Sequence, residues 1–424
     1  MNLRASSVAI VVLAALIANA GTTRYVDINN ANPLQPYTNW ATAATVIQDA
    51  IDSGNPGDEI VVANGAYATG GRAVYGTMTN RVAVYQAMEV RSVNGPAVTS
   101  IQGVAGPASA AIRCVYLANG AVLSGFTVTG GGTRITGDWF NEQSCGGVLC
   151  ESVSAVVSNC TITGNIARGA GAGAYSGTLN DCTINGNFAN SGGGGGASSS
   201  TLNNCTVSGN SAASGGGVQY GKLNNCSITG NSAGSYGGGT YSCTLSNCAV
   251  INNHGPLSGG GAYSSDMLNC VVSGNTSSDT GGGVTGGNLK NCLVASNSSR
   301  FGGGAAYCDL LNCTVTGNTA HDSAQVGGGG YGGGTITGPS LTQSFTTTKV
   351  SSTALTGVRQ LFRTPAHCPS RAATATSLMT PCSGIPPMGI IICKQTRLAS
   401  TPAIARRSPL LLTLMVSRAW WMAW

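Results

Sequence analysis

Apolar and polar side chains alternate in short runs through most of the chain, and glycine or asparagine separates one run from the next. In one such run, Cys205 and Val207 fall on the same face of an extended segment. Thr206 and Ser208 alternate with them and fall on the opposite face. Valine and threonine also suit the pleated surface of a sheet. The pattern therefore predicts short β-strands joined by turns.

The pattern returns at intervals of 21 to 23 residues. Its clearest marker is a cysteine two positions before a valine or isoleucine: Cys160, Cys182, Cys205, Cys226, Cys248, Cys270, Cys292 and Cys313. A period of this length indicates a solenoid, in which each unit buries its apolar face against the next. Gly-Asn and triple-glycine stretches, such as 215–217, are typical of turns. The sequence therefore predicts an all-β fold, a parallel β-helix with about 22 residues per coil.

A leucine-rich repeat is the alternative fold, because four residues also fit its spacing: Leu202, Cys205, Val207 and Asn210. The rest of such a unit usually supplies a helix. Residues 211–217 instead read Ser-Ala-Ala-Ser-Gly-Gly-Gly, which is poor in helix propensity and in apolar bulk. The β-helix is therefore the favoured interpretation.

Over residues 54–334 these glycine-rich and asparagine-rich units resemble the right-handed parallel β-helix proteins, which have the pectate-lyase-like fold. Among them, the units look like those of secreted bacterial β-helix proteins and polymorphic outer-membrane proteins. The resemblance implies a right-handed solenoid, an N-terminal cap and a location outside the cell or at the cell surface or outer membrane. It implies no particular activity, since one fold serves many functions.

The first 20 residues have the features of a secretory signal peptide. Arg4 precedes an apolar stretch, Val8 to Ile17, and Ala18-Asn19-Ala20 resembles a cleavage site. No other segment approaches the length of about 20 apolar residues that a membrane-spanning helix needs. We therefore expect export and no transmembrane span.

Residues 21–110 are expected to form an N-terminal cap and the first coils, and residues 111–334 the regular repeats. Asn39 is placed to cap an amphipathic helix. Its apolar face would consist of Ala43, Val46, Ile47, Ala50 and Ile51. Such a helix would cover the open end of the stack.

The composition changes after residue 334. No aspartate or glutamate follows Asp322, no asparagine follows Asn318, and nine of the 20 basic residues lie in residues 335–424. The rest of the chain therefore has 11 basic residues against 14 acidic ones. The basic residues of the tail are dispersed, so we expect no nucleic-acid partner.

The same tail has the features of translation in a shifted reading frame. A shift of two bases at Trp420–Ala423 forces Val-Asp-Gly, and neighbouring stretches then permit the missing asparagine and aspartate. We therefore interpret residues 335–424 as an aberrant, frameshifted or disordered tail.

The eight repeat cysteines are expected to be buried as free thiols in one column, because in-register parallel strands do not aim their Cβ atoms at each other. Bridges or a metal along the column are the alternative. Cys243 and Cys308 share another column three coils apart, about 14 Å at the spacing of strands, and cannot pair. Cys145 and Cys150 could form a disulfide in an exported protein. No cysteine or histidine pair has zinc-ligand spacing within one coil.

An asparagine column precedes the cysteines: Asn159, Asn204, Asn225, Asn247, Asn269, Asn291 and Asn312. We expect its side-chain amides to stack at a turn, and hydrogen bonding to glycans is the alternative. A second group recurs behind the glycines and could stack sugar rings: Tyr220, Tyr241, Tyr263 and Tyr307. The alternative is a set of partly buried strand residues with solvated hydroxyls.

Carboxylates are few beyond Cys150. Asp266, Asn288 and Asp309 each lie four residues before a repeat cysteine and should form a polar column. Its carboxylates would lie about 10 Å apart, at the edge of the 6.5–9.5 Å that inverting glycosidases need. Calcium would need further oxygens, and a solvated face is the alternative. Lys290 lies beside Asn288 but outside the column.

The sequence as a whole predicts a secreted or cell-surface, structural or adhesin-like protein that could bind polysaccharide or cell-surface glycans. No catalytic site is evident, and no cofactor is expected apart from the calcium considered above. The alternative is a polysaccharide lyase or glycoside hydrolase of the β-helix class. A third interpretation is a product without function, as a consequence of the aberrant tail.

Overall fold

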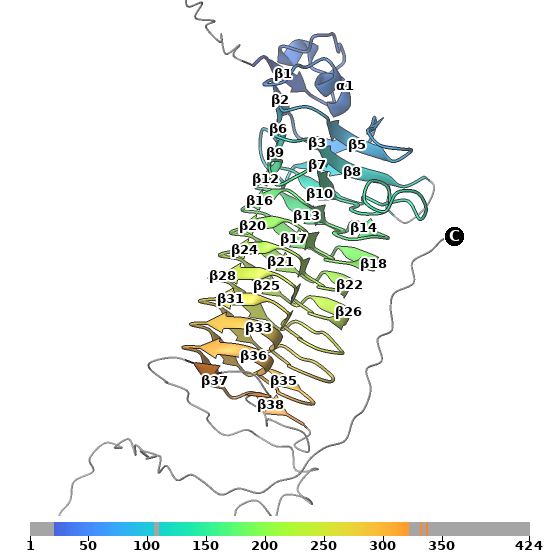
Figure 1. Cartoon of the computed structure of the whole chain (residues 1–424). Helices are drawn as coiled ribbons and strands as arrows, with labels where there is room; N and C mark the ends of the chain where they lie inside the picture. The colour runs from blue at the N-terminus through green and yellow to red at the C-terminus, as the bar shows by residue number, and fades with distance from the viewer. Residues whose placement is uncertain (1–20, 106–109, 322–330, 333–335, 338–424) are drawn as a thin grey trace, which may run out of the picture. The chain divides into compact units, whose positions relative to one another are not determined.

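The computed structural model describes residues 21–105, 110–321, 331–332 and 336–337, which belong to one compact unit. They form a right-handed parallel β-helix (Figure 1). This confirms the predicted fold, and the alternative of a leucine-rich repeat is wrong. The predicted signal peptide lies outside the described residues, as does the tail apart from 336–337.

Each regular coil has four straight segments, which we number one to four in chain order. Segments one and two lie in the largest sheet, which continues into the first coils. Its strands are β1 (Thr23–Val26), β2 (Glu59–Val62), β4 (Arg72–Ala73), β5 (Thr79–Val84), β6 (Glu89–Ser92), β8 (Ile112–Leu117), β9 (Val122–Ser124), β11 (Val148–Cys150), β12 (Val156–Ser158), β15 (Ala174–Tyr175), β16 (Thr178–Asn180), β19 (Ala197–Ser198), β20 (Thr201–Asn203), β23 (Val218–Gln219), β24 (Lys222–Asn224), β27 (Thr240–Tyr241), β28 (Thr244–Ser246), β30 (Ala262–Tyr263), β31 (Asp266–Leu268), β33 (Val284–Lys290), β36 (Ala305–Leu311), β39 (Tyr331–Gly332) and β40 (Ile336–Thr337).

Segment three forms the second sheet, with strands β3 (Gly65–Tyr67), β7 (Thr99–Gln102), β10 (Thr127–Thr129), β13 (Thr161–Thr163), β17 (Thr183–Asn185), β21 (Thr206–Ser208), β25 (Ser227–Thr229), β29 (Ala249–Ile251), β32 (Val271–Ser273), β34 (Leu293–Ala295) and β37 (Thr314–Thr316). Segment four pairs in two short sheets. One contains β14 (Ile166–Ala167), β18 (Phe188–Gly193), β22 (Ser211–Ser214) and β26 (Ser232–Tyr236), and the other contains β35 (Ser298–Ser299) and β38 (Thr319–Ala320). The strands pair in parallel, except that β4 and β5 form an antiparallel hairpin.

Strict register stacks equivalent residues into columns inside the helix. Leu202 pairs with Leu223, and Val207 pairs with Ile228. These side chains are fully buried and belong to one continuous hydrophobic core. Because the side-chain period of a strand is two, the polar residues between them face solvent. The alternation in the sequence therefore separates core from surface in each coil.

A ladder of buried asparagines runs along the axis, one per coil: Asn165, Asn187, Asn210, Asn231, Asn253, Asn275, Asn297 and Asn318. The Oδ1 atom of Asn231 accepts hydrogen bonds from the backbone N–H and the Nδ2 of Asn210, each at 3.0 Å. Its own Nδ2 donates to the carbonyl of Val207 (3.0 Å) and to Asn253 Oδ1 (3.0 Å). Each amide thus satisfies backbone groups that the tight turn leaves unpaired. The sequence suggested only turn residues here.

The triple glycines pass over this ladder. The first glycine of each triplet has a left-handed backbone, as at Gly215 (φ 59°). A Cβ on the third, Gly217, would lie 2.6 Å from the carbonyl oxygen of Gly239 and 3.1 Å from the amide of Asn231. A side chain would therefore separate the coil from the ladder beneath it.

The repeat cysteines lie at the bend between segments two and three. The thirteen cysteines that the structure describes are all buried and free, which confirms the predicted thiol column. Cys226 Sγ accepts a hydrogen bond from the backbone N–H of Cys205 (3.4 Å) and donates to the carbonyl of Asn224 (3.2 Å). The thiols therefore fill the core and also satisfy backbone groups at the bend. Cys243 and Cys308 occupy equivalent positions at the preceding bend, three coils apart as predicted, and burial raises the pKa of each to about 12.

A column of exposed asparagines directly precedes the repeat cysteines at the bend between segments two and three. Its residues adopt left-handed backbone conformations, with φ between 47° and 55°. Side-chain amides hydrogen-bond from coil to coil, as from Asn269 to Asn247 and from Asn291 to Asn269 (each 3.1 Å). This confirms the predicted stacking of amides at a turn. Asp181 takes the asparagine's place in one coil and accepts from Asn204 (3.2 Å).

The prediction of one helix beginning after Asn39 is wrong. Asn39 instead caps a single 3-10 turn, η1 (Trp40–Thr42), and its side chain accepts from the backbone N–H of Thr42 (3.1 Å). Ala44 then forms a bridge to Val26 of β1. The chain therefore joins the sheet before it becomes helical.

The α-helix, α1 (Ile47–Asp52), lies at the N-terminal end of the stack (Figure 1). It begins after Val46, which makes no side-chain capping hydrogen bond. Of the predicted apolar face, Val46 is partly exposed and the others are buried: Ala43, Ile47, Ala50 and Ile51. Ile47 and its buried neighbours belong to the same core as the first coils.

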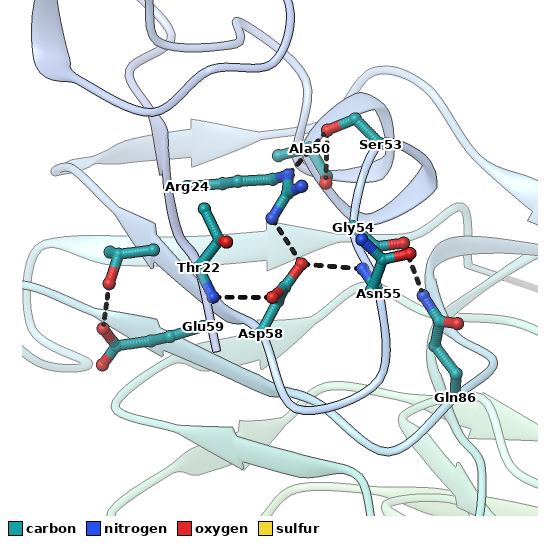
Figure 2. Close-up of polar contacts among 10 residues, drawn as sticks. Thr22, Arg24, Ala50, Ser53, Gly54, Asn55, Asp58, Glu59 and Gln86 are labelled. Atoms are coloured by element: carbon teal, nitrogen blue, oxygen red, sulfur yellow. Dashed lines mark hydrogen bonds and ion pairs between the residues drawn. The ribbon is translucent and has the colours of Figure 1, made fainter. Parts of the chain in front are cut away.

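Asp58 lies at the centre of a buried polar cluster that joins β1 to the turn after α1 (Figure 2). Its carboxylate accepts from the guanidinium of Arg24 (2.5 Å) and from the backbone N–H groups of Thr22 and Asn55 (each 2.7 Å). Arg24 Nε also donates to Ser53 Oγ (3.1 Å), directly after α1. Burial by itself raises the pKa of Asp58, but the hydrogen bonds and the positive charge of Arg24 outweigh it and lower the pKa.

The substitution Asn231→Ala should lower the free energy of unfolding by about 2 kcal/mol or more, because it leaves a buried N–H and a buried carbonyl unpaired. Asn225→Gly, which removes an exposed amide and keeps the left-handed bend, is the matched control and should cost less than about 0.5 kcal/mol. Urea unfolding followed by circular dichroism measures both. Equal losses in the two variants would contradict the role of the buried ladder.

The substitution Asp58→Asn should destabilise the protein at pH 7 by about 3 kcal/mol, because it leaves the Arg24 charge buried and unpaired. Asp58 has a lowered pKa in the folded state. Its ionisation therefore stabilises the fold above the unfolded pKa of about 3.9. That contribution is lost as the pH falls through the folded pKa, so the difference between wild type and variant should shrink toward pH 2.

Urea midpoints at pH 7 and pH 2 test this dependence. The control is Glu59→Gln, which affects a more exposed pair, Arg91–Glu59, at 2.6 Å. Exposed pairs contribute about 1 kcal/mol or less. The prediction fails if Asp58→Asn costs no more than Glu59→Gln at neutral pH.

Candidate functional site

On the outward side of segment one, which comprises β8, β11, β15, β19, β23, β27 and β30, a column of equivalent positions holds four tyrosines. Tyr116 pairs with Leu149, which pairs with Tyr175, and the register continues through the next coils to Tyr241 and Tyr263. Ser198 and Gln219 take the places between them. The small residue before Tyr175, Tyr241 and Tyr263 is buried, so these three rings point away from the core. Tyr116 is itself buried, in a small cluster with Cys145 and Leu149.

A long loop, residues 130–147, joins β10 to β11 beside this column. Trp139 and Phe140 lie on the loop and are 40% and 55% exposed. The ring of Phe140 lies 6.0 Å from the ring of Tyr175, centroid to centroid. The loop thus adds two aromatic side chains next to the column.

Arg113, on β8, holds the loop in place. Its guanidinium is buried and donates to the carbonyls of Cys145 (2.7 Å), Asn141 (2.7 Å) and Ser144 (2.9 Å). It also donates to Asn80 Oδ1 (2.9 Å). Burial lowers the pKa of Arg113 to about 10, so the side chain remains a cation at neutral pH.

Glu142 fixes the loop from its other side. Its carboxylate accepts from the backbone N–H and the hydroxyl of Thr77 (2.8 and 2.9 Å) and from the backbone N–H of Asp138 (3.0 Å). These hydrogen bonds lower the pKa of Glu142. The loop is therefore anchored to β8 and to the residues before β5, which gives Trp139 and Phe140 fixed positions.

Two hollows adjoin each other under the loop and share Phe140 and Tyr175. The first, of about 450 Å³, is lined by Tyr75, Tyr116, Asn119, Phe140, Asn141, Leu149, Cys150, Glu151 and Tyr175. The second, of about 370 Å³, is lined by Trp139, Phe140, Ala170, Tyr175, Ser191, Gly192, Gly193, Ser198, Ser199, Ala213, Ser214, Gln219 and Tyr220. Aromatic walls with a few polar groups are typical of ligand sites.

Glu151 is the one charged residue among those lining residues. The hydroxyls of Tyr116 and Tyr75 donate to its Oε1, the latter at 3.2 Å, and the backbone N–H of Asn119 donates to its Oε2 (3.0 Å). Burial raises the pKa of Tyr116, and the hydrogen bond to Glu151 raises it further. Tyr116 therefore stays protonated and continues to donate to the carboxylate.

The aromatic surface continues past the second hollow. The rings of Tyr220 and Tyr241 meet edge to face at 5.9 Å, and those of Tyr241 and Tyr263 stack at 5.4 Å. Tyr236, at the end of β26, lies 4.9 Å from Tyr263. We call this set of residues the aromatic face: Tyr75, Tyr116, Trp139, Phe140, Tyr175, Tyr220, Tyr236, Tyr241 and Tyr263.

Two of the predicted tyrosines occupy strained bend positions. Tyr220 and Tyr307 have φ angles of 54° and 55°, where most other coils place serine. A bulky residue in this conformation costs about 1–3 kcal/mol, and such strain is concentrated at functional sites. Tyr220 joins the aromatic face. It lies one residue past the column, but its ring contacts Tyr241 and lines the second hollow. Tyr307, which is 70% exposed, lines neither hollow, and the column beside it holds Thr285 and Ala306 in place of tyrosine.

The polar column of Asp266, Asn288 and Asp309 forms in the predicted register. All three side chains are exposed, and Asp266 Oδ1 accepts from the backbone N–H (2.9 Å) and Nδ2 (2.8 Å) of Asn288. Lys290 pairs with Leu268 and Leu311, outside the column. None of the three lines either hollow.

Calcium needs six to eight oxygen ligands. The column supplies two carboxylates and an amide that is already bonded to one of them, so these residues do not fit a resident calcium ion. Within the described parts of the chain, no group of three or more His, Cys, Asp or Glu side chains is placed to hold a metal.

Cys145 and Cys150, the pair considered for a disulfide, are buried free cysteines in the structure. Cys145 belongs to the loop and Cys150 ends β11. A disulfide between them in an oxidising environment stays a prediction.

Sequence reasoning identified Tyr220, Tyr241 and Tyr263 and missed the rest of the aromatic face. Tyr116 and Tyr175 lie outside the most regular part of the repeat, and the loop interrupts it. A signal was present nonetheless, because aromatic residues are scarce in this chain and several cluster near residues 116–175.

A scan against models of protein families found no match, and neither did a search of curated proteins. Solved structures do match. The Dettilon tailspike protein (gp208) is 12% identical, with 75% of this chain and 69% of that chain covered and a TM-score of 0.39. The pectate lyase Pel9A is 13% identical, with 78% and 81% covered and a TM-score of 0.33. The A-module of the Azotobacter vinelandii mannuronan C-5 epimerase AlgE4 is 12% identical, with 71% and 94% covered and a TM-score of 0.37.

The likeness is one of fold alone. In the described residues, no helix is long and apolar enough to cross a membrane.

The substitution Arg113→Met should release the loop, because it leaves three loop carbonyls without their donor at a cost of roughly 1 kcal/mol or more each. We expect at least fivefold faster chymotrypsin cleavage at Trp139 or Phe140 and faster hydrogen exchange over residues 131–145. Lys222→Met, which removes an exposed cation elsewhere in the sheet, is the control. Unchanged cleavage in Arg113→Met would show that the loop does not depend on Arg113.

Proposed function

We propose that the protein is a secreted or cell-surface β-helix protein that binds glycans on its aromatic face. The observation that carries this proposal is the set of exposed and half-exposed rings that borders two adjoining hollows, from Tyr75, Trp139 and Phe140 to Tyr241 and Tyr263, with Tyr116 buried beneath the first hollow. Sugar rings present apolar C–H faces to aromatic side chains, and their hydroxyls bond to the polar groups between them.

The arrangement matches an extended ligand. The accessible tyrosines of the column run from Tyr175 to Tyr263, which are four coils apart in register. At about 4.8 Å per coil this part of the column is roughly 19 Å long. This length suits an oligosaccharide or polysaccharide chain along the helix axis better than a single sugar.

The rigidity of the face also favours binding. Tyr175, Tyr241 and Tyr263 lie on strands of one continuous sheet, and Arg113 and Glu142 fix the loop. A preorganised surface loses little conformational entropy when it binds. Such a surface would serve an adhesive or glycan-presenting role without any chemical step.

Tyr175→Ala and Tyr241→Ala should each weaken glycan binding roughly five- to tenfold, or about 1–1.4 kcal/mol, because each removes one ring of the face. Affinity electrophoresis or calorimetry of the full chain against a polysaccharide panel measures this change. The fluorescence of Trp139, which lines the second hollow, provides a second signal.

The matched control is Tyr307→Ser, an exposed tyrosine outside the face replaced by the residue that most other coils have at this bend. It should leave affinity unchanged. Product analysis in the same experiments detects cleavage. Retention of no polysaccharide, or equal loss in Tyr175→Ala and Tyr307→Ser, would contradict the proposal.

A further inference from the structure

The charge of the two hollows bears on the class of glycan that fits. Among the described residues that line them, none is lysine, arginine or histidine. The second hollow is lined only by uncharged residues, including Ser191, Ser199 and Gln219. Uncharged donors and acceptors of this kind match sugar hydroxyls.

The single charge in the first hollow is negative. Glu151 is bonded to two tyrosine hydroxyls and to one backbone N–H, and no cation neutralises it in the described structure. Glu151 is exposed at the mouth of the hollow, so a carboxylate of the ligand at this position would meet a like charge that solvent and salt only partly screen.

We propose that the aromatic face binds uncharged glycan chains and rejects acidic ones, with Glu151 as the residue that discriminates between them. This inference rests on the proposed function and adds the substrate class. An anionic polymer carries a carboxylate on many of its sugars, so it places charge near Glu151 in every alignment along the face. A neutral polymer of the same backbone keeps the stacking and hydroxyl contacts without the repulsion.

The test compares glycans of one backbone and different charge, using the full chain. The pairs are hydroxyethyl cellulose with carboxymethyl cellulose, and highly methyl-esterified pectin with polygalacturonate. In any pair that binds, we expect the neutral glycan to bind at least tenfold more tightly than the acidic one at low salt. The difference should narrow in 0.5 M NaCl, because salt screens the repulsion.

Glu151→Gln should reduce the ratio of the affinities for the neutral and the acidic glycan at least threefold. The affinity for the neutral glycan should change little, since glutamine still accepts hydrogen bonds from the tyrosines. Glu89→Gln, an exposed carboxylate outside the hollows, is the matched control and should leave the preference unchanged. Circular dichroism confirms that each variant is folded.

The outcomes separate the two proposals. Equal or tighter binding of the acidic member, or an unchanged preference in Glu151→Gln, overturns the charge selectivity and leaves glycan binding intact. If the protein retains neither member of either pair and no other polysaccharide of the panel, glycan binding itself is overturned.

Discussion

The structure depends on one constraint, which is that every coil must pair its backbone with the next coil in strict register. Strands satisfy this along their length, but tight bends leave N–H and carbonyl groups unpaired. The buried asparagine ladder supplies partners at one bend, and the sulfur atoms of the cysteines supply them at another. Since an unpaired buried amide costs more than a hydrogen bond returns, these residues recur wherever the bend does.

The same register determines what the surface can present. Residues of successive coils are brought together along the axis although they are about 22 positions apart in the sequence. A single tyrosine on such a surface would be unremarkable, whereas Tyr241 and Tyr263 stack because one lies above the other. The loop held by Arg113 adds side chains beside the column that the repeat itself does not supply.

The fold could be predicted because periodicity, turn residues and strand alternation all point to the same architecture. The site could be predicted only in part. Tyr220 and Tyr307 both lie one residue past the register position of the column, and only Tyr220 has a tyrosine, Tyr241, at the column position of the next coil. The buried and the exposed asparagines are the same residue type at the same period, so their different roles follow from the positions of the bends. The loop has no periodic signal at all, and its anchoring by Arg113 depends on contacts between residues far apart in the sequence.

Each coil adds one fixed rise along the axis, so the length of the aromatic face is determined by the number of coils that contribute to it. Tandem duplication of one unit would insert a complete coil, whose bends already carry their own asparagine and cysteine. Such an insertion would extend the ligand-facing surface by one step without requiring a new core. Chain recognition in a solenoid of this kind could thus evolve by copying, with single substitutions at the outward position of segment one then deciding whether the added step carries a ring.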